Sequence, residues 1–188
     1  MFNFLNLITN NYFLKQKLKI NPVSSPVRRL TNNWQGNIIF GEKIVKGKFN
    51  TKKISDFQKF NFLRDLKSEG SIKARSIARS LVNQWINEHT NLQSKVFDSE
   101  VMAERITSWS FNYSWFGESG DLEFQKKVLG SIALQAKYLE LRLNQSNDHL
   151  EKIIIIKGIL VSKSILYETI DNIDQLLSII SEKVKILT

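Results

Sequence analysis

The sequence predicts a mainly α-helical protein built from antiparallel helical hairpins. The chain of 188 residues contains only two prolines and eight glycines, a scarcity that favours long helices over a turn-rich β-protein. From residue 56 onward, apolar residues recur at helical spacing, with capping residues between the segments. The connections between segments are short, so successive helices should pack antiparallel.

Residues 1–55 are expected to form an N-terminal helix followed by a basic extended arm. Residues 2–19 have an amphipathic pattern, which suits docking onto the body of the protein or lying on a membrane surface. Both prolines fall in the connector that follows, where they disfavour helix. Residues 37–49 carry β-branched side chains punctuated by two glycines, and this pattern predicts a short hairpin or extended segment.

Capping residues divide residues 56–188 into six expected helices. The side chains able to cap them are Asp56, Ser71, Asp98 or Ser99, Asp121 and Asp148. Gly70 ends the first helix, and Glu118–Gly120 closes the third. In the fourth, Gly130 and two alanines should let a neighbouring helix approach closely. The sixth begins near Ile173, and its apolar face continues to the last residues, as expected of an architecture that has more chain to come.

Positive charge is concentrated in the N-terminal third. The formal net charge is +9. Residues 1–60 contain eleven Lys or Arg and two Asp or Glu, whereas residues 61–188 contain sixteen of each sign. This excess suits nucleic acid, anionic lipid or acidic polysaccharide, or it is a solvated surface. Nucleic acid is not expected as a partner, because lysine predominates in the basic region and no aromatic–basic RNA motif is present.

Several classes of protein are excluded by what the sequence lacks. It has no cysteine, which rules out disulfides, thiolate metal sites and a cysteine nucleophile. His89 and His149 have no partner at metal-ligand spacing, and no metalloprotease, hydrolase, phosphate-loop or dinucleotide motif occurs. We therefore predict no metal, no cofactor and no catalytic residue in this chain. No run approaches the ~20 apolar residues of a membrane span, and the N-terminus is a poor signal peptide. A cytoplasmic location is expected, with the periplasm as the alternative.

The segment Arg105–Phe116 holds the candidate binding residues. Arg105, Trp109 and Asn112 are spaced i, i+4, i+7 on one helical stripe, and Tyr113 lies beside them. A cation, a flat ring and an amide on one face can grip a polar, planar or anionic ligand. The same stripe could instead be core, with Arg105 satisfied by a carboxylate.

Three segments in order resemble the N-terminal part of heparinase II/III-like proteins, in particular a bacterial branch without an obvious signal peptide. Asn33–Phe49 is similar to that branch's Trp-x-Gly followed by a Gly-(Lys/Arg)-Phe strand. Phe60–Trp85 resembles a Phe-x-(Trp/Phe)-Leu-Arg-Asp-Leu block and a helix ending in Val-x-x-Trp. Arg105–Asn112 matches Arg-(Leu/Ile)-x-Ser-Trp, and the similarity continues through Gln135–Leu143. Together these segments span about residues 28–167.

The resemblance implies a partial α/α toroid over residues 56–188 and a substrate of acidic, uronate-containing polysaccharide. Family members cleave such polymers by β-elimination, which needs a base and neutralisation of the uronate carboxylate. No stretch here matches their catalytic His and Tyr residues, so the chain is expected to be inactive alone and to be completed by further chain of the same fold or by a partner covering the last helix. The resemblance also raises the prospect that Arg105 pairs with a sugar carboxylate, Trp109 or Tyr113 stacks on a pyranose ring and Asn112 bonds to a hydroxyl.

Alternatives remain open on the sequence, both for the function and for single residues. One functional alternative is nucleic-acid binding through residues 15–59. The chain could be a non-catalytic helical scaffold or binding module whose basic arm meets an acidic partner. For single residues, the Trp34 ring either packs at the turn before Gly36 or forms a flat surface that contacts a ligand. Arg64 and Asp65 read either as a structural bridge or as substrate-binding residues.

Overall fold

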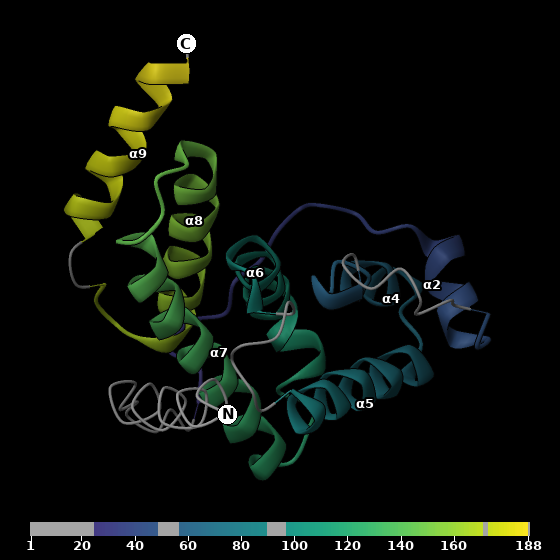
Figure 1. Cartoon of the computed structure of the whole chain (residues 1–188). Coiled ribbons are helices and arrows are strands. Elements are labelled where there is room, and N and C mark those ends of the chain that lie inside the picture. Colours follow the sequence, from purple (N-terminus) through teal and green to yellow (C-terminus); the bar gives the residue numbers. More distant parts are fainter. Residues whose placement is uncertain (1–24, 49–56, 90–96, 171–172, 188) are drawn as a thin grey trace, which may run out of the picture.

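The structure is a computed structural model that describes residues 25–48, 57–89, 97–170 and 173–187. In these ranges the chain forms seven helices, packed antiparallel, and no β-strand (Figure 1). Their bounds are α2 Ile38–Val45, α4 Leu63–Glu69, α5 Ile72–Glu88, α6 Ser99–Phe116, α7 Leu122–Leu143, α8 His149–Leu166 and α9 Ile173–Leu187. The prediction of an antiparallel helical fold is confirmed, while the toroid stays a prediction. The helix expected at 2–19 and the Asp56 cap lie outside the described residues.

The hairpin or extended segment predicted for residues 37–49 is wrong, because helix α2 occupies most of that stretch. Asn37 caps it by accepting a hydrogen bond from the Phe40 N–H at 3.0 Å. Gly41 lies so close to α4 that an added Cβ would stand 2.4 Å from the Asp65 carbonyl oxygen. A good cap and close packing on α4 therefore outweigh the strand preference of the β-branched residues.

Most predicted helix boundaries are confirmed by capping geometry. The side chains of Ser71, Asp121 and Asp148 accept hydrogen bonds from the first-turn N–H groups of α5, α7 and α8. Gly70 adopts a left-handed conformation, with φ of 81°, at the end of α4. Asp98 precedes α6 but makes no capping bond through its side chain. These local signals fix where the chain turns, and hence which helices become neighbours.

Helix α6 lies at the centre of the molecule. It packs against α4 and α5 on one side and against α7 and α8 on the other (Figure 1). Its inward side chains are among the most buried in the protein: Met102, Ala103, Ile106, Trp109, Tyr113 and Phe116. Helix α9 packs on α8, with Leu176 buried in the contact. No helix in the described part of the chain is long and apolar enough to cross a membrane.

A glycine does permit a close helix approach, but it is Gly158 rather than Gly130. A Cβ added to Gly158 on α8 would lie 2.8 Å from the Ala103 Cβ on α6. At Gly130 the same atom would have no described atom within 4 Å. Among the described residues, Gly130 therefore meets no neighbouring helix, and the tight contact at a glycine is between α6 and α8.

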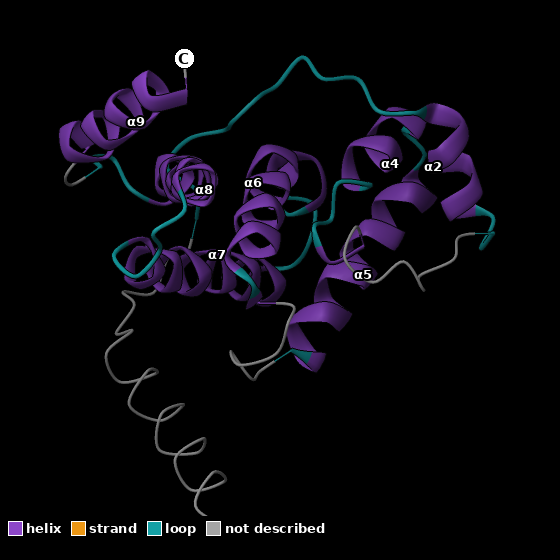
Figure 2. Ribbon diagram, turned by 45° about the horizontal axis from the view of Figure 1, so that its top comes forward, coloured by secondary structure: helices purple, strands orange, loops and turns teal. Residues whose placement is uncertain are grey.

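Residues 25–37 have no regular secondary structure and run from α8 across the molecule to α2 (Figure 2). We call this segment the arm. At its start the Val27 N–H donates to the Ile165 carbonyl at 2.8 Å, and the Arg28 guanidinium donates to the Glu168 carbonyl at 2.9 Å. Arg29 then pairs with Glu118 at 2.8 Å. Part of the predicted basic excess is thus held against the body of the protein.

Candidate functional site

The four predicted binding residues all lie on α6 and are all buried. Arg105 and Trp109 are fully buried, Tyr113 is 1% exposed and Asn112 is 4% exposed. The stripe is real, but it faces other helices. Its burial is what the packing alternative predicts.

Among the described residues, two neutral acceptors and two aromatic rings contact the buried guanidinium group of Arg105. Its Nε donates to Gln135 Oε1 at 2.8 Å, and Nη1 donates to the Gln58 carbonyl at 3.1 Å. The guanidinium carbon lies 4.0 Å from the centre of the Trp85 ring. Burial lowers the pKa of Arg105 well below its usual value. The arginine therefore joins α6 to α7 and to the segment before α4.

The aromatic members of the stripe pack in the same region. Trp109 makes edge-on contacts with Phe60 at 5.3 Å and Trp85 at 5.5 Å between ring centres. Tyr113 packs against Phe116. Burial, followed by the charge of Glu118, raises the pKa of Tyr113 to about 12.

The structure brings the resembling segments together into one unit. The Gly36 N–H donates to Ser68 Oγ at 2.9 Å, and the Asn37 N–H donates to Asp65 Oδ1 at 2.7 Å. An added Cβ at Gly36 would lie 2.2 Å from the Arg64 carbonyl oxygen, so only glycine fits there. Farther along, Ser108 Oγ donates to the Phe60 carbonyl at 2.7 Å. The first segment is thus bonded to the second, and the second to the third.

A groove of about 480 Å³ opens where these three segments meet. We call it the Trp34 groove. Its lining residues are Asn32, Asn33, Trp34, Gln35, Arg64, Lys67, Ser68 and Asn112. Trp34 is 67% exposed, with its ring centre 6.4 Å from that of Phe111. Of the four predicted residues, only Asn112 reaches this groove, and its Nδ2 donates to the Ser108 carbonyl at 2.8 Å.

The groove is cationic where it meets α4. Arg64 and Lys67 line it, and no carboxylate does so among the described residues. Asp65 lies behind them, buried, with its Oδ1 3.9 Å from Arg64 Nε. Burial raises the pKa of Asp65, against the opposing effects of the Asn37 N–H bond and Arg64. These groups can together hold an anionic ligand that carries hydroxyl groups: the exposed ring contacts a flat face of the ligand, the amides bond to hydroxyls and the two cations pair with the negative charge.

The described residues place the two histidines outside the Trp34 groove and form no cluster of metal ligands. No group of three or more His, Asp or Glu side chains is placed to hold a metal ion there. His89 stacks on Trp85 at 4.7 Å between ring centres, and its Nδ1 lies 3.0 Å from the Trp85 carbonyl oxygen. His149 is the first residue of α8. Neither histidine lines the Trp34 groove.

Trp34 and Arg64 are ligand-contact alternatives on the sequence, whereas Lys67 and the amides of residues 32, 33 and 35 are groove residues that the sequence pattern did not predict. One signal was available. Asn-Asn-Trp-Gln immediately precedes a glycine, and a polar run around an aromatic residue at a tight backbone contact is unusual for core.

Comparison of the chain with protein-family models, curated proteins and solved structures gave no match.

Proposed function

We propose that this chain is a helical segment of a heparinase II/III-like polysaccharide lyase and that the Trp34 groove binds its acidic saccharide. The observation that carries the proposal is the meeting of the three resembling segments at one groove lined by an exposed tryptophan and two cations. The residues that carry the resemblance then act in two ways. Gly36, Asp65 and Ser68 position the arm, and the groove residues beside them contact the ligand.

Each groove residue has a role that follows from its chemistry. The Trp34 face stacks on the apolar face of a pyranose ring. Arg64 and Lys67 neutralise a uronate carboxylate, with the planar guanidinium suited to a bidentate pair. The side-chain amides of Asn33 and Gln35 bond to ring hydroxyls. Buried Arg105 and Trp109 support the helix beneath the groove and do not contact the sugar.

The elimination chemistry lies outside this chain in our proposal. β-Elimination needs a group that removes the proton next to the carboxylate, and no His or Tyr lines the groove among the described residues. The purified chain should therefore form no unsaturated product from heparin, heparan or alginate, as followed by ultraviolet absorbance. Turnover at a rate typical of lyases would contradict this part of the proposal while leaving saccharide binding intact.

The binding test compares an alginate oligosaccharide with its carboxyl-reduced form, using isothermal titration. We expect the acidic form to bind more tightly, because only it offers carboxylates to the two cations. The double variant Arg64→Met/Lys67→Met should weaken binding of the acidic form at least ten-fold, consistent with loss of charge-assisted hydrogen bonds worth about 1.5–3 kcal/mol before solvent screening. Trp34→Ala should weaken binding of both forms.

The matched control removes two charges elsewhere. Lys43 and Lys48 are exposed and lie outside the groove. Lys43→Met/Lys48→Met should change the affinity less than two-fold. Equal losses in the two double variants would mean that the ligand responds only to overall charge, and the groove assignment would fail.

That result would favour the second candidate, a non-catalytic module whose basic region meets an acidic partner. One observation supports it: Lys43 and Lys48 remain exposed on and just after α2, whereas Arg28 and Arg29 are bonded to the body of the protein. Among the described basic residues, Lys43, Lys48 and Arg28 are exposed and form no ion pair with a described carboxylate, so such a partner would meet α2 or the start of the arm.

A further inference from the structure

A second groove lies between α5 and the start of α7. Its volume is about 590 Å³, and we call it the α5–α7 groove. The lining residues are Ser76, Arg79, Ser80, Asn83, Ser119, Gly120, Asp121, Glu123, Phe124 and Lys127. It shares no residue with the Trp34 groove, and the function proposed above does not use it.

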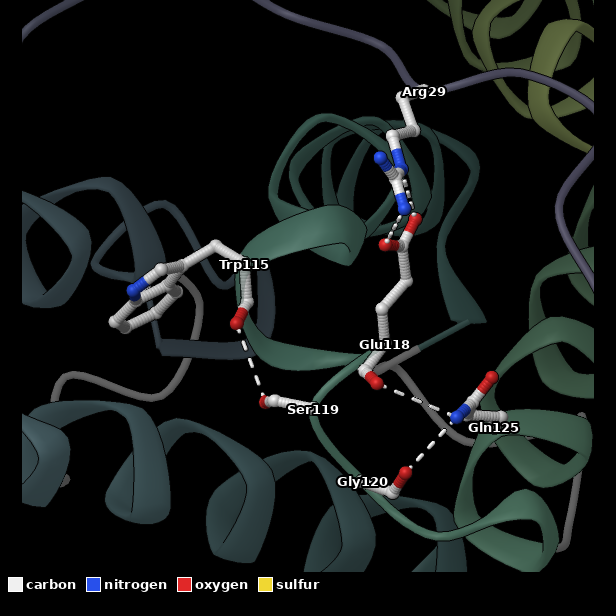
Figure 3. Close-up of polar contacts among 6 residues, drawn as sticks. All are labelled: Arg29, Trp115, Glu118, Ser119, Gly120 and Gln125. Atoms are coloured by element: carbon white, nitrogen blue, oxygen red, sulfur yellow. Dashed lines mark hydrogen bonds and ion pairs between the residues drawn. The ribbon is translucent and has the colours of Figure 1, made fainter.

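One wall is the turn between α6 and α7, which is fixed by hydrogen bonds (Figure 3). Ser119 Oγ donates to the Trp115 carbonyl at 3.3 Å, and Gln125 Nε2 donates to the Gly120 carbonyl at 2.9 Å. The ion pair of Glu118 with Arg29 ties the same turn to the arm. These bonds hold the wall in one conformation without a ligand, so less conformational entropy is lost on binding.

Two basic side chains form hydrogen bonds that connect the two walls of the groove. Arg79 Nη1 on α5 donates to Ser119 Oγ at 2.8 Å, and Lys127 Nζ on α7 donates to Asn83 Oδ1 at 2.7 Å and to Asn87 Oδ1 at 2.5 Å. These partners are neutral, and neither cation forms an ion pair within the described part of the chain. An arginine has five N–H donors and a lysine three, so both retain capacity for a ligand.

The acceptors in the groove balance these donors. Asp121 and Glu123 contribute two carboxylates, so the four charged lining residues sum to zero. Three serine hydroxyls and the Asn83 amide add groups that bond to either a donor or an acceptor. Phe124, half-buried against Phe116 at 6.3 Å between ring centres, supplies an apolar surface.

From this composition we infer that the α5–α7 groove binds a neutral saccharide unit. Each sugar hydroxyl both donates and accepts, so it needs mixed donors and acceptors rather than a field of one sign. An acidic sugar would meet Asp121 and Glu123, and a cationic one would meet Arg79 and Lys127. The groove thus differs in ligand class from the Trp34 groove, which has cations without carboxylates.

The test titrates the folded chain with a panel of neutral methyl hexosides and with glucuronate at millimolar concentrations, followed by amide chemical shifts in NMR spectra. We expect at least one neutral hexoside to shift the signals of residues 119–121 and the Asn83 side-chain amide. Ser80→Trp, which fills the groove from an exposed position on α5, should weaken that binding at least ten-fold. Lys127→Met should also weaken it, whereas its exposed neighbour Lys126 lies outside the groove and Lys126→Met should change the affinity less than two-fold.

Failure of every neutral hexoside to shift these signals would overturn the inference, as would tighter binding of glucuronate at the same residues. Unchanged binding in Ser80→Trp would do so too. Unfolding of Lys127→Met would leave Ser80→Trp to decide. None of these outcomes bears on the alginate titration, so failure here is distinguishable from failure of the Trp34 groove.

Discussion

At the scale of single residues, Arg105 shows how a cation can be part of a core. Its polar atoms are met by Gln135 and by the Gln58 carbonyl, and its flat face lies over Trp85. A planar guanidinium can bond in its plane and stack through its face at once, which a lysine cannot. The described groups around Arg105 are therefore matched to the planar shape of its guanidinium group.

Arg105→Met should lower the free energy of unfolding by about 2–4 kcal/mol, because it leaves buried acceptors without their donor. Arg105→Lys should also destabilise. Urea denaturation measures both, with Arg142→Met as the control, since Arg142 is exposed and its loss should change stability by less than about 0.5 kcal/mol. Normal stability combined with lost alginate binding would instead identify Arg105 as a ligand-contacting residue.

Tyr113 predicts a specific response to alkaline pH. Its pKa is raised from 10.0 to about 12 in the folded protein. Above pH 10 the unfolded chain releases the phenolic proton while the folded one retains it until about pH 12, so this residue makes stability fall as pH rises through that window.

The hydroxyl of Tyr113 has no hydrogen-bond partner among the described residues. Tyr113→Phe should therefore change stability at neutral pH by less than about 1 kcal/mol, and it should lose less stability than the parent between pH 10 and pH 12. Urea titrations at several alkaline pH values provide the measurement. Parallel pH profiles for the two proteins would contradict the assignment.

The sequence predicted that Arg105, Trp109 and Asn112 share one face of a helix, but it did not predict which residues pack against that face. Helical spacing places Arg105, Trp109 and Asn112 together whatever faces them. The covering groups come from Gln58, Trp85 and Gln135, which are distant in sequence, and no local pattern specifies such contacts. Exposed Trp34 was harder still, because ring size alone favours burial.

At the scale of elements, boundaries were predictable where a side chain caps the helix by itself. Ser71, Asp121 and Asp148 carry their signal locally. Helix α2 was not predictable from its β-branched composition, because its packing on α4 through Gly41 decides the outcome. The same limit explains Gly130 and Gly158: both lie inside continuous helices, and only the partner helix distinguishes them.

These two glycines form a matched pair for mutation. Gly158→Ala should destabilise by about 1–3 kcal/mol, because the new methyl group meets Ala103 at 2.8 Å. Gly130→Ala should stabilise by about 0.5–1 kcal/mol, because it raises helix propensity and has room for the methyl group. Thermal unfolding followed by circular dichroism compares them. Combining Gly158→Ala with Ala103→Gly should cost less than the sum of the two single changes, and strict additivity would argue against the close contact.

At the scale of the whole molecule, stability should fall off with distance from α6. That helix packs against four others, whereas α9 packs on α8. Elements with few packed neighbours open locally, and elements at the centre open only when the protein unfolds. The Trp34 groove, built partly on the arm, should lie between these extremes.

Native-state hydrogen exchange tests this gradient. Amides in the middle of α6 should exchange only through global unfolding, with an opening free energy equal to that from urea denaturation. Amides in α9 should exchange through local opening that is insensitive to low urea concentrations. Equal protection in both helices would show that they unfold as one cooperative unit.

The tie between the arm and the far end of the chain bears on biosynthesis. Arg28 and its acceptor Glu168 are separated by 140 residues. A ribosome releases the N-terminus first, so the arm emerges well before α8 can receive it. Contacts of Gly36 and Asn37 with α4 are available early, because they join neighbouring parts of the chain. The end of the arm that lines the Trp34 groove can thus be positioned during translation, whereas its other end is bonded to α8 and Glu168 only as synthesis nears the last helices.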